Sequence, residues 1–282
     1  MNPGVAGAIR SVAIAAAAAG ERGALSAIIR PMLDSFARQM LYPAPPVPVS
    51  SPPPAPLEEV WLDLPDGGRV QAWALIAPTL PATAPLVTFF HGNGENLETL
   101  RWSGLFEEFG RLGVAVLAAD FPGYGRSTGI PSEEGLTATG EAAAAWAREH
   151  HPERPLVVCG WSLGAALAIA TVDRHPEAVR GLIALSPWTT LAEVAVGIFP
   201  EFAVKAMLRE HYDSRSAARR IQVPALVVHG ERDDLIPVAQ GEEIAAVLAG
   251  PTDWVPVHGA AHNDLLGRRE VWEAMARFLS GL

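Results

Sequence analysis

The chain has 282 residues, of which 49% are hydrophobic and 18% charged, and its formal net charge is −10. This length fits one large domain around a buried sheet, or two small domains. The acidic balance argues against a nucleic acid or an anionic membrane as the main partner, because a phosphate-binding surface needs clustered positive charge. The single cysteine, Cys159, excludes an internal disulfide, and we expect it to be a small buried hydrophobic residue.

Residues 1–42 are predicted to form a separate N-terminal helical segment. Its longest uncharged stretch, Ser11–Gly20, has ten residues, whereas a membrane-spanning helix needs roughly 20. We therefore expect no transmembrane span and a cytoplasmic protein. Two alternatives stay open, namely export through a signal peptide and peripheral contact of these residues with a membrane surface.

A proline-rich linker is predicted next. Residues 43–56 contain eight prolines, which fix the backbone dihedral φ and lack the N–H that a helix or a sheet ladder needs. This composition predicts an extended spacer between the N-terminal segment and a main domain over residues 57–282.

Apolar runs and helix-like segments alternate along the main domain. It opens with a predicted hairpin in which Val60–Leu64 and Arg69–Ala77 flank a Pro-Asp-Gly-Gly turn. The later strands are predicted at Leu86–Phe90, Val114–Ala119, Leu156–Cys159, Gly181–Leu185, Ala225–Val228 and Trp254–Val257, and the helices at Leu97–Phe109, Glu133–His150, Leu163–Arg174, Ala239–Leu248 and Arg268–Leu279. Such repeated units predict an α/β fold with a mostly parallel eight-stranded sheet and helices on both faces.

The most informative motif is the pentapeptide Gly160–Gly164, which reads Gly-Trp-Ser-Leu-Gly. It lies where the apolar run ending at Cys159 gives way to an alanine-rich helical pattern. A serine in such a strand–turn–helix elbow adopts a strained backbone conformation, and the two glycines let neighbouring backbone pack without clashing Cβ atoms. Ser162 is therefore the predicted nucleophile.

The acid and base for this serine are expected at the carboxyl ends of later strands, because ligands of an open α/β sheet bind at that edge. Asp233 follows the seventh strand and is the predicted triad acid, with Asp234 and Asp120 as alternatives. His262 follows the eighth strand and is the predicted general base, with His258 as the alternative. The order serine, aspartate, histidine is the one expected for this sheet topology.

Two backbone amides are predicted to form an oxyanion hole. They belong to Asn93, in the glycine-rich loop His91–Asn96 after the third strand, and to Leu163, the residue after the nucleophile. We expect His91 to brace this loop through hydrogen bonds. The remaining histidines lack the spacing of a metal site, so neither a metal nor a cofactor is predicted.

From about residue 57 to its end the chain resembles the α/β-hydrolase family. The resemblance rests on five motifs in the family's order, which are His91–Asn96, Asp120–Ser127, Gly160–Gly164, His229–Pro237 and Gly259–Asp264. The chain is most similar to the branch that includes the Bem46-like proteins and the mammalian depalmitoylating members. The resemblance implies a serine hydrolase with a small helical cap, which here corresponds to residues 187–220.

Together these features predict a cofactor-independent serine hydrolase that cleaves a small-molecule carboxylic ester through an acyl-enzyme on Ser162. A cap this short favours short or medium acyl chains. The alternatives are an acyl thioesterase or depalmitoylase, a cofactor-free perhydrolase, and a non-catalytic receptor that keeps the fold.

Overall fold

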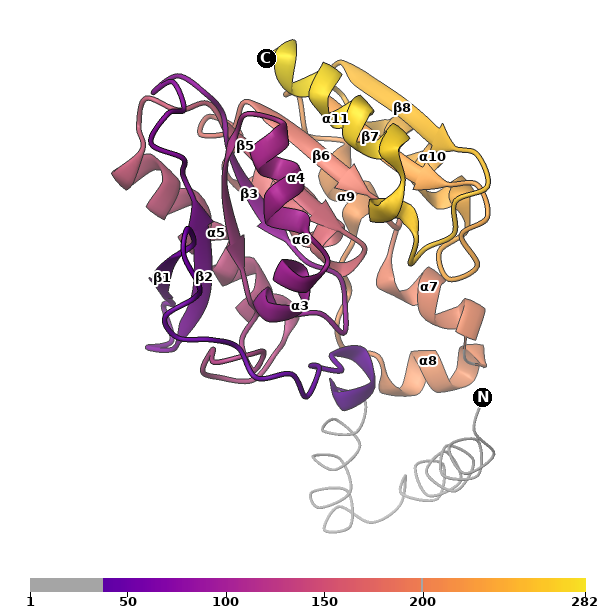
Figure 1. Ribbon diagram of the computed structural model, residues 1–282. Coiled ribbons are helices and arrows are strands. Elements are labelled where there is room, and N and C mark those ends of the chain that lie inside the picture. Colours follow the sequence, from indigo (N-terminus) through magenta and orange to yellow (C-terminus); the bar gives the residue numbers. More distant parts are fainter. Residues whose placement is uncertain (1–37, 199) are drawn as a thin grey trace.

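The computed structural model describes residues 38–198 and 200–282 (Figure 1). Residues 1–37 lie outside the described residues, and with them most of the N-terminal helical segment predicted over residues 1–42 and the two alternatives left open for it, a signal peptide and a membrane contact. Within the described ranges, no helix combines the length and the apolar character that a bilayer crossing requires.

Eight strands form a single sheet in the order β1-β2-β4-β3-β5-β6-β7-β8. Their bounds are β1 (Glu58–Asp63), β2 (Arg69–Leu75), β3 (Leu86–Phe90), β4 (Ala115–Ala119), β5 (Leu156–Trp161), β6 (Gly181–Leu185), β7 (Ala225–Gly230) and β8 (Thr252–Val257). β2 runs antiparallel to β1 and to β4, and the other neighbouring strands are parallel. The predicted eight-stranded, mostly parallel sheet is confirmed.

Helices cover both faces of this sheet (Figure 1). The bounds are α3 (Leu97–Trp102), α4 (Leu105–Arg111), α5 (Glu133–His150), α6 (Leu163–Arg174), α7 (Leu191–Ile198), α8 (Glu201–Met207), α9 (Ser214–Ala218), α10 (Val238–Val247) and α11 (Arg269–Ser280), with a 3-10 helix, η2 (Leu265–Gly267), before the last of them. Residues of α5, α6, α9 and α10 pack on one face, and residues of α3, α4 and α11 on the other.

The central strands are buried at every position, which is why they read as continuous apolar runs. In β3, Leu86 and Phe90 belong to the core on one face of the sheet, whereas Val87 and Phe89 belong to the core on the other. This alternation follows from the two-residue period of a strand. The sheet is therefore a rigid platform, and its carboxyl edge can carry loops that hold a site.

The prediction of one continuous helix over Leu97–Phe109 is wrong, because the structure has two helices there. Gly104 takes a φ of 81°, in the left-handed region that glycine adopts without steric cost, and the chain changes direction at this residue. Asn96 begins α3 through a capping box with Thr99. The apolar spacing continues across both helices, so the sequence pattern does not reveal the break at Gly104.

The proline-rich segment packs along the body of the molecule. The backbone carbonyl of Val47 accepts a hydrogen bond from Asn96 Nδ2 at 2.8 Å, and the hydroxyl of Ser50 donates one to Glu98 at 2.9 Å. Val49 is buried in the core that α3 and α4 cover. These contacts fix the path of the chain from residue 42 to the first strand.

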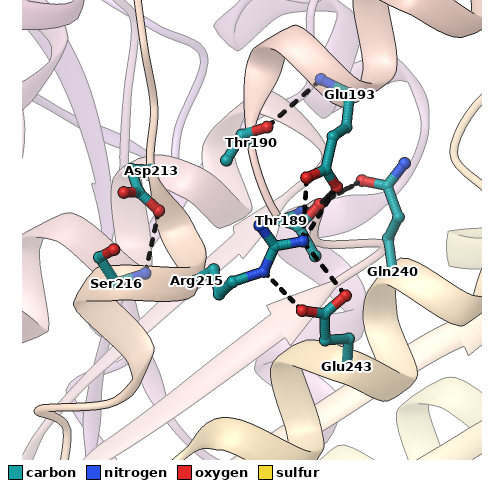
Figure 2. Close-up of polar contacts among 8 residues, drawn as sticks. All are labelled: Thr189, Thr190, Glu193, Asp213, Arg215, Ser216, Gln240 and Glu243. Atoms are coloured by element: carbon teal, nitrogen blue, oxygen red, sulfur yellow. Dashed lines mark hydrogen bonds and ion pairs between the residues drawn. The ribbon is translucent and has the colours of Figure 1, made fainter.

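The cap region contains α7, α8 and α9. α7 and α8 lie at the carboxyl edge of the sheet, beside the indigo residues 38–42 in Figure 1, whereas α9 packs on the sheet face next to α6 and α10. A polar network ties the cap region to α10 (Figure 2). The guanidinium of Arg215 on α9 lies 2.9 Å from a carboxylate oxygen of Glu193 on α7 and 2.5 Å from one of Glu243 on α10. The Thr189 N–H donates to Gln240 Oε1 at 3.1 Å. Three helices are thereby joined through one arginine.

Replacing Arg215 with Met keeps much of the side chain's length but removes both ion pairs. We expect the free energy of unfolding to fall by about 1 kcal/mol, a modest figure because both carboxylates are partly exposed to screening solvent. Urea unfolding measures the change. Arg219→Met is the matched control, since no ion pair of Arg219 occurs among the described residues, and an equal loss in both variants would contradict the bracing role.

Candidate active site

Ser162 lies at the turn between β5 and α6 with φ 57° and ψ −115°, a conformation that is strained for any residue other than glycine. Its N–H donates to the carbonyl of Leu185 on the neighbouring strand at 2.9 Å, which continues the sheet pairing up to the turn. The chain then enters α6 directly. This geometry lifts the hydroxyl off the strand and presents it at the carboxyl edge of the sheet.

The two glycines of the pentapeptide allow this turn because their neighbours leave no room for a side chain. A Cβ at Gly160 would lie 1.9 Å from the carbonyl oxygen of Gly164, and a Cβ at Gly164 would lie 2.0 Å from that of Phe90. Backbone therefore packs directly on backbone on both sides of Ser162. These contacts agree with the reason expected from the sequence: glycine is needed at both positions because a Cβ would clash with neighbouring backbone.

Three predicted residues meet at this edge. The Ser162 hydroxyl lies 3.0 Å from His262 Nε2, and His262 Nδ1 lies 2.7 Å from Asp233 Oδ2. An ionised Asp233 can only accept, so the proton of the neutral imidazole sits on Nδ1 and leaves Nε2 free to accept from the serine. All three side chains are buried. The hydrogen bonds form a continuous relay from carboxylate to hydroxyl.

The carboxylate of Asp233 is held in its ionised form. Burial by itself raises the pKa of Asp233, but hydrogen bonds from His229, from His262 and from the Ile236 N–H outweigh burial and hold that pKa below its ordinary value. Its other oxygen, Oδ1, accepts from the N–H groups of Leu235 and Ile236 at 3.0 and 2.8 Å. The loop after β7 thus fixes both the charge and the orientation of this side chain.

His229 supports Asp233, a role that the sequence motif alone does not indicate. It is fully buried at the end of β7, with Nε2 at 3.2 Å from Asp233 Oδ2 and 2.9 Å from the carbonyl of Ile236. Gly241 on α10 makes room for the ring, since a Cβ there would lie 2.2 Å from His229 Nδ1. The sequence feature that could have indicated this contact is the spacing of His229 and Asp233, which lie four residues apart across a turn.

The alternative residues lie elsewhere. Asp120 is fully buried beside His91, 3.4 Å from its Nε2, and accepts from the Leu97 N–H at 2.9 Å. The side chain of His258 is 97% exposed and contacts Glu231. Asp234 is exposed. His262 therefore has Asp233 as its carboxylate partner, and His91 packs in the loop that the sequence predicted it to brace, with Nδ1 at 2.7 Å from the Gly92 carbonyl.

The residues predicted for the oxyanion hole flank Ser162. Leu163 is the first residue of α6, where helical N–H groups have no partner within the helix, and Asn93 lies in the loop after β3. Among the hydrogen bonds of the described residues, none is donated by either of these two backbone amides. The side chain of Asn93 is held from two sides, donating to the carbonyl of Leu41 at 2.5 Å and accepting from the hydroxyl of Tyr124 at 2.8 Å.

An apolar cavity of about 150 Å³ opens beside these groups and is called the small cavity below. It is lined by Met40, Leu41, Tyr42, Asn93, Ser162, Leu163, Trp188, Leu191, Val194, Ala195, Tyr212, Leu235 and Ile236. The hydroxyls of Tyr42 and Tyr212 meet at 2.7 Å, so the start of the described chain and the cap share one wall. Across residues 38–198 and 200–282, no group of three or more metal-binding side chains is placed to hold an ion.

The comparisons with known proteins agree with this fold. Residues 85–211 match the alpha/beta hydrolase fold family. An uncharacterized protein of Mycobacterium tuberculosis is 34% identical over 249 residues, which cover 86% of this chain and 87% of the relative. The chain belongs to the α/β-hydrolase family.

Other similar proteins extend the comparison. Protein bem46 of Schizosaccharomyces pombe is 28% identical to the chain over 189 residues, covering 65% of the chain and 62% of the relative. Among solved structures, the esterase Pf2001 of Pyrococcus furiosus superposes with a TM-score of 0.68 at 19% identity, over 84% of this chain and 98% of that one. The resemblance to the α/β-hydrolase family and to its Bem46 branch is thereby confirmed.

Adding one methyl group at Gly164 tests the elbow. Because a Cβ there overlaps the carbonyl of Phe90, we expect Gly164→Ala to lower the free energy of unfolding by about 3 kcal/mol or to prevent folding. Gly197→Ala is the control, since Gly197 lies in α7 with open space around its Cα and should gain up to about 1 kcal/mol. Thermal and urea unfolding compare the two, and a Gly164→Ala protein of unchanged stability would refute the close approach.

Proposed function

We propose that this α/β-hydrolase cleaves carboxylic esters through an acyl-enzyme on Ser162. The observation that carries the proposal is the chain of hydrogen bonds from Asp233 through His262 to Ser162, ending beside an apolar cavity. A serine hydroxyl is a weak nucleophile until a neighbouring base can take its proton, and His262 Nε2 is at the distance that such a transfer needs.

Acylation follows from the roles of the three side chains. Ser162 Oγ attacks the ester carbonyl while His262 Nε2 takes its proton, and the imidazolium that forms is stabilised by the Asp233 carboxylate. His262 then gives the proton to the departing alkoxide as the carbon–oxygen bond breaks. Water repeats the sequence on the acyl-enzyme and releases the acid. His229 acts in this scheme as a positioning residue, because it contacts Asp233 rather than the reacting atoms.

The tetrahedral intermediates place a negative charge on the former carbonyl oxygen. We assign its stabilisation to the backbone N–H groups of Asn93 and Leu163, which lie on the wall of the small cavity together with Ser162. The contacts of the Asn93 side chain with Leu41 and Tyr124 hold this loop in place before substrate binds. Preorganised donors of this kind lower the barrier because they need no rearrangement during the reaction.

The small cavity is proposed to hold the acyl group. Its volume of about 150 Å³ matches that of an engineered protein cavity that binds benzene. An acyl chain of roughly four to six carbons therefore fills it. The same chemistry would cleave a short thioester, whereas a long acyl chain exceeds this volume. The esterase named among the structural neighbours is consistent with ester chemistry.

Removing the nucleophile gives the first functional test. We expect Ser162→Ala to lose hydrolysis of 4-nitrophenyl acetate by roughly 10³-fold or more, since no other group in the site can carry the acyl intermediate. Release of 4-nitrophenolate is followed by absorbance, and circular dichroism checks that the variant is folded. A folded Ser162→Ala protein that retains wild-type turnover would refute the mechanism.

Enlarging the small cavity should shift the acyl preference. Leu191 is buried on its wall, so Leu191→Ala should move the optimum of a 4-nitrophenyl ester series toward longer chains by about two carbons. Val196→Ala is the matched control on the same helix, because Val196 is 45% exposed and does not line the cavity. Identical chain-length profiles in wild type and Leu191→Ala would place the acyl group elsewhere.

A further inference from the structure

A second and larger cavity, called the outer groove below, lies on the histidine side of the site. Its volume is about 400 Å³, and it runs between the α3–α4 region and the start of α11. Its walls include Glu95, Ser103, Trp161, Asn263 and Trp272. Trp161 directly precedes the nucleophile, and the mechanism proposed above gives it no task.

Two residues that line the outer groove, Trp161 and Asn263, are neighbours of His262. The Trp161 ring stacks on the His262 ring with centroids 5.4 Å apart and an interplanar angle of 29°. Asn263 follows His262 in the chain, and Glu95 lies in the loop that carries Asn93, where it accepts the Gly92 N–H at 3.2 Å. The small cavity, by contrast, is lined by Asn93 and Leu163 on the oxyanion side.

The proposed mechanism likewise places the two halves of an ester on different sides of Ser162, one toward His262 and the other toward the oxyanion hole. His262 must hand its proton to the leaving oxygen, so the alcohol portion departs on the histidine side while the acyl portion stays on Ser162. With the acyl group in the small cavity, the outer groove is a cavity next to His262 that can take the alcohol. This step rests on the proposed ester hydrolysis.

The lining of the outer groove is suited to hydroxyl groups. The indole N–H of Trp161 is buried and has no acceptor among the described residues, and a buried donor of this kind is costly unless something accepts from it. The benzo edge of the same ring rests on Gly92, where a Cβ would come within 2.7 Å. The apolar faces of Trp161 and Trp272 supply surface for a carbon skeleton, and Asn263 and Ser103 add polar groups.

The charge in the outer groove does not favour an ionic ligand. Burial raises the pKa of Glu95, although the Gly92 N–H and the nearby His91 and His262 lower it in part. Arg269, at the outer end, pairs with Glu273 at 3.0 Å. Glu108 pairs with Arg111. Arg269 and Glu108 thus have ion-pair partners of their own. Glu95 is the remaining carboxyl group of the lining, and its burial favours the neutral form.

We propose that the outer groove binds the alcohol portion of the ester and that this alcohol is a neutral polyol, such as glycerol or a sugar. Trp161 is then a specificity residue: its indole N–H, which has no acceptor among the described residues, donates a hydrogen bond to a hydroxyl oxygen of the substrate. A small acyl group on a larger hydroxylated alcohol is the ester that fits both cavities.

A matched pair of acetates tests the assignment. 1-Acetylglycerol and propyl acetate share the acetyl group and a three-carbon alcohol, and they form the same acetyl-enzyme, so any difference in kcat/KM arises on the alcohol side. We expect kcat/KM, measured by acid release in a pH-stat, to be about tenfold or more higher for 1-acetylglycerol. Hydrolysis of both esters with equal or reversed preference would overturn the inference alone, whereas hydrolysis of neither would overturn the proposed function.

Trp161→Phe removes the indole N–H and keeps an aromatic ring. It should lower the ratio of the two kcat/KM values roughly three- to tenfold, the effect of losing one hydrogen bond. Trp102→Phe is the matched control, because Trp102 is 62% exposed on α3 and does not line the outer groove. An unchanged ratio in a folded Trp161→Phe protein would overturn the role given to Trp161.

The wild-type protein offers a test that needs no variant. With 4-nitrophenyl acetate as donor, the acetyl-enzyme can be attacked by added glycerol instead of water. The glycerol oxygen bonds to the acyl carbon, its proton passes through His262 to Ser162 Oγ, and the bond to Ser162 breaks. We expect saturable formation of 1-acetylglycerol and no saturation with 1-propanol. Linear dependence on both alcohols would show that no alcohol site exists.

Discussion

The structure depends on one strained turn. Ser162 can hold its positive φ only because the strand before it and the helix after it approach so closely that no side chain fits at Gly160 or Gly164. Many buried contacts of β5 and α6 stabilise this approach, and the strain at a single residue is small beside them. The hydroxyl is thus fixed in space by the core of the sheet rather than by a mobile loop.

The other groups of the site are held toward this fixed point by segments that are distant in sequence. The loop after β7 presents Asp233 with its charge stabilised by His229, and the loop after β8 brings His262 between Asp233 and Ser162. The start of the described chain also takes part, because the Leu41 carbonyl holds Asn93 and Tyr42 meets the cap at Tyr212. The cavities on either side of the serine are therefore assembled from the whole length of the domain.

Local pattern was enough to predict the sheet and the residues that meet at its edge, because parallel strands buried on both faces are continuous apolar runs and their carboxyl ends share one edge. The break at Gly104 escaped prediction, since an isolated glycine within an amphipathic pattern is compatible with a helix. The roles of His229 and of residues 41 and 42 were not predicted from the sequence, for a different reason. They depend on contacts between segments far apart in the chain, and no periodicity encodes such contacts.

The proposed mechanism depends on Ser162 as the residue that carries the acyl group. Treatment of the folded protein with a fluorophosphonate, followed by digestion and mass spectrometry, tests it directly, since these reagents phosphonylate a serine that a neighbouring base activates. We expect one adduct on the peptide that contains Ser162, and its loss in both Ser162→Ala and His262→Ala. An unlabelled wild-type protein, or an adduct on another residue that persists in Ser162→Ala, would rule out Ser162 as the nucleophile.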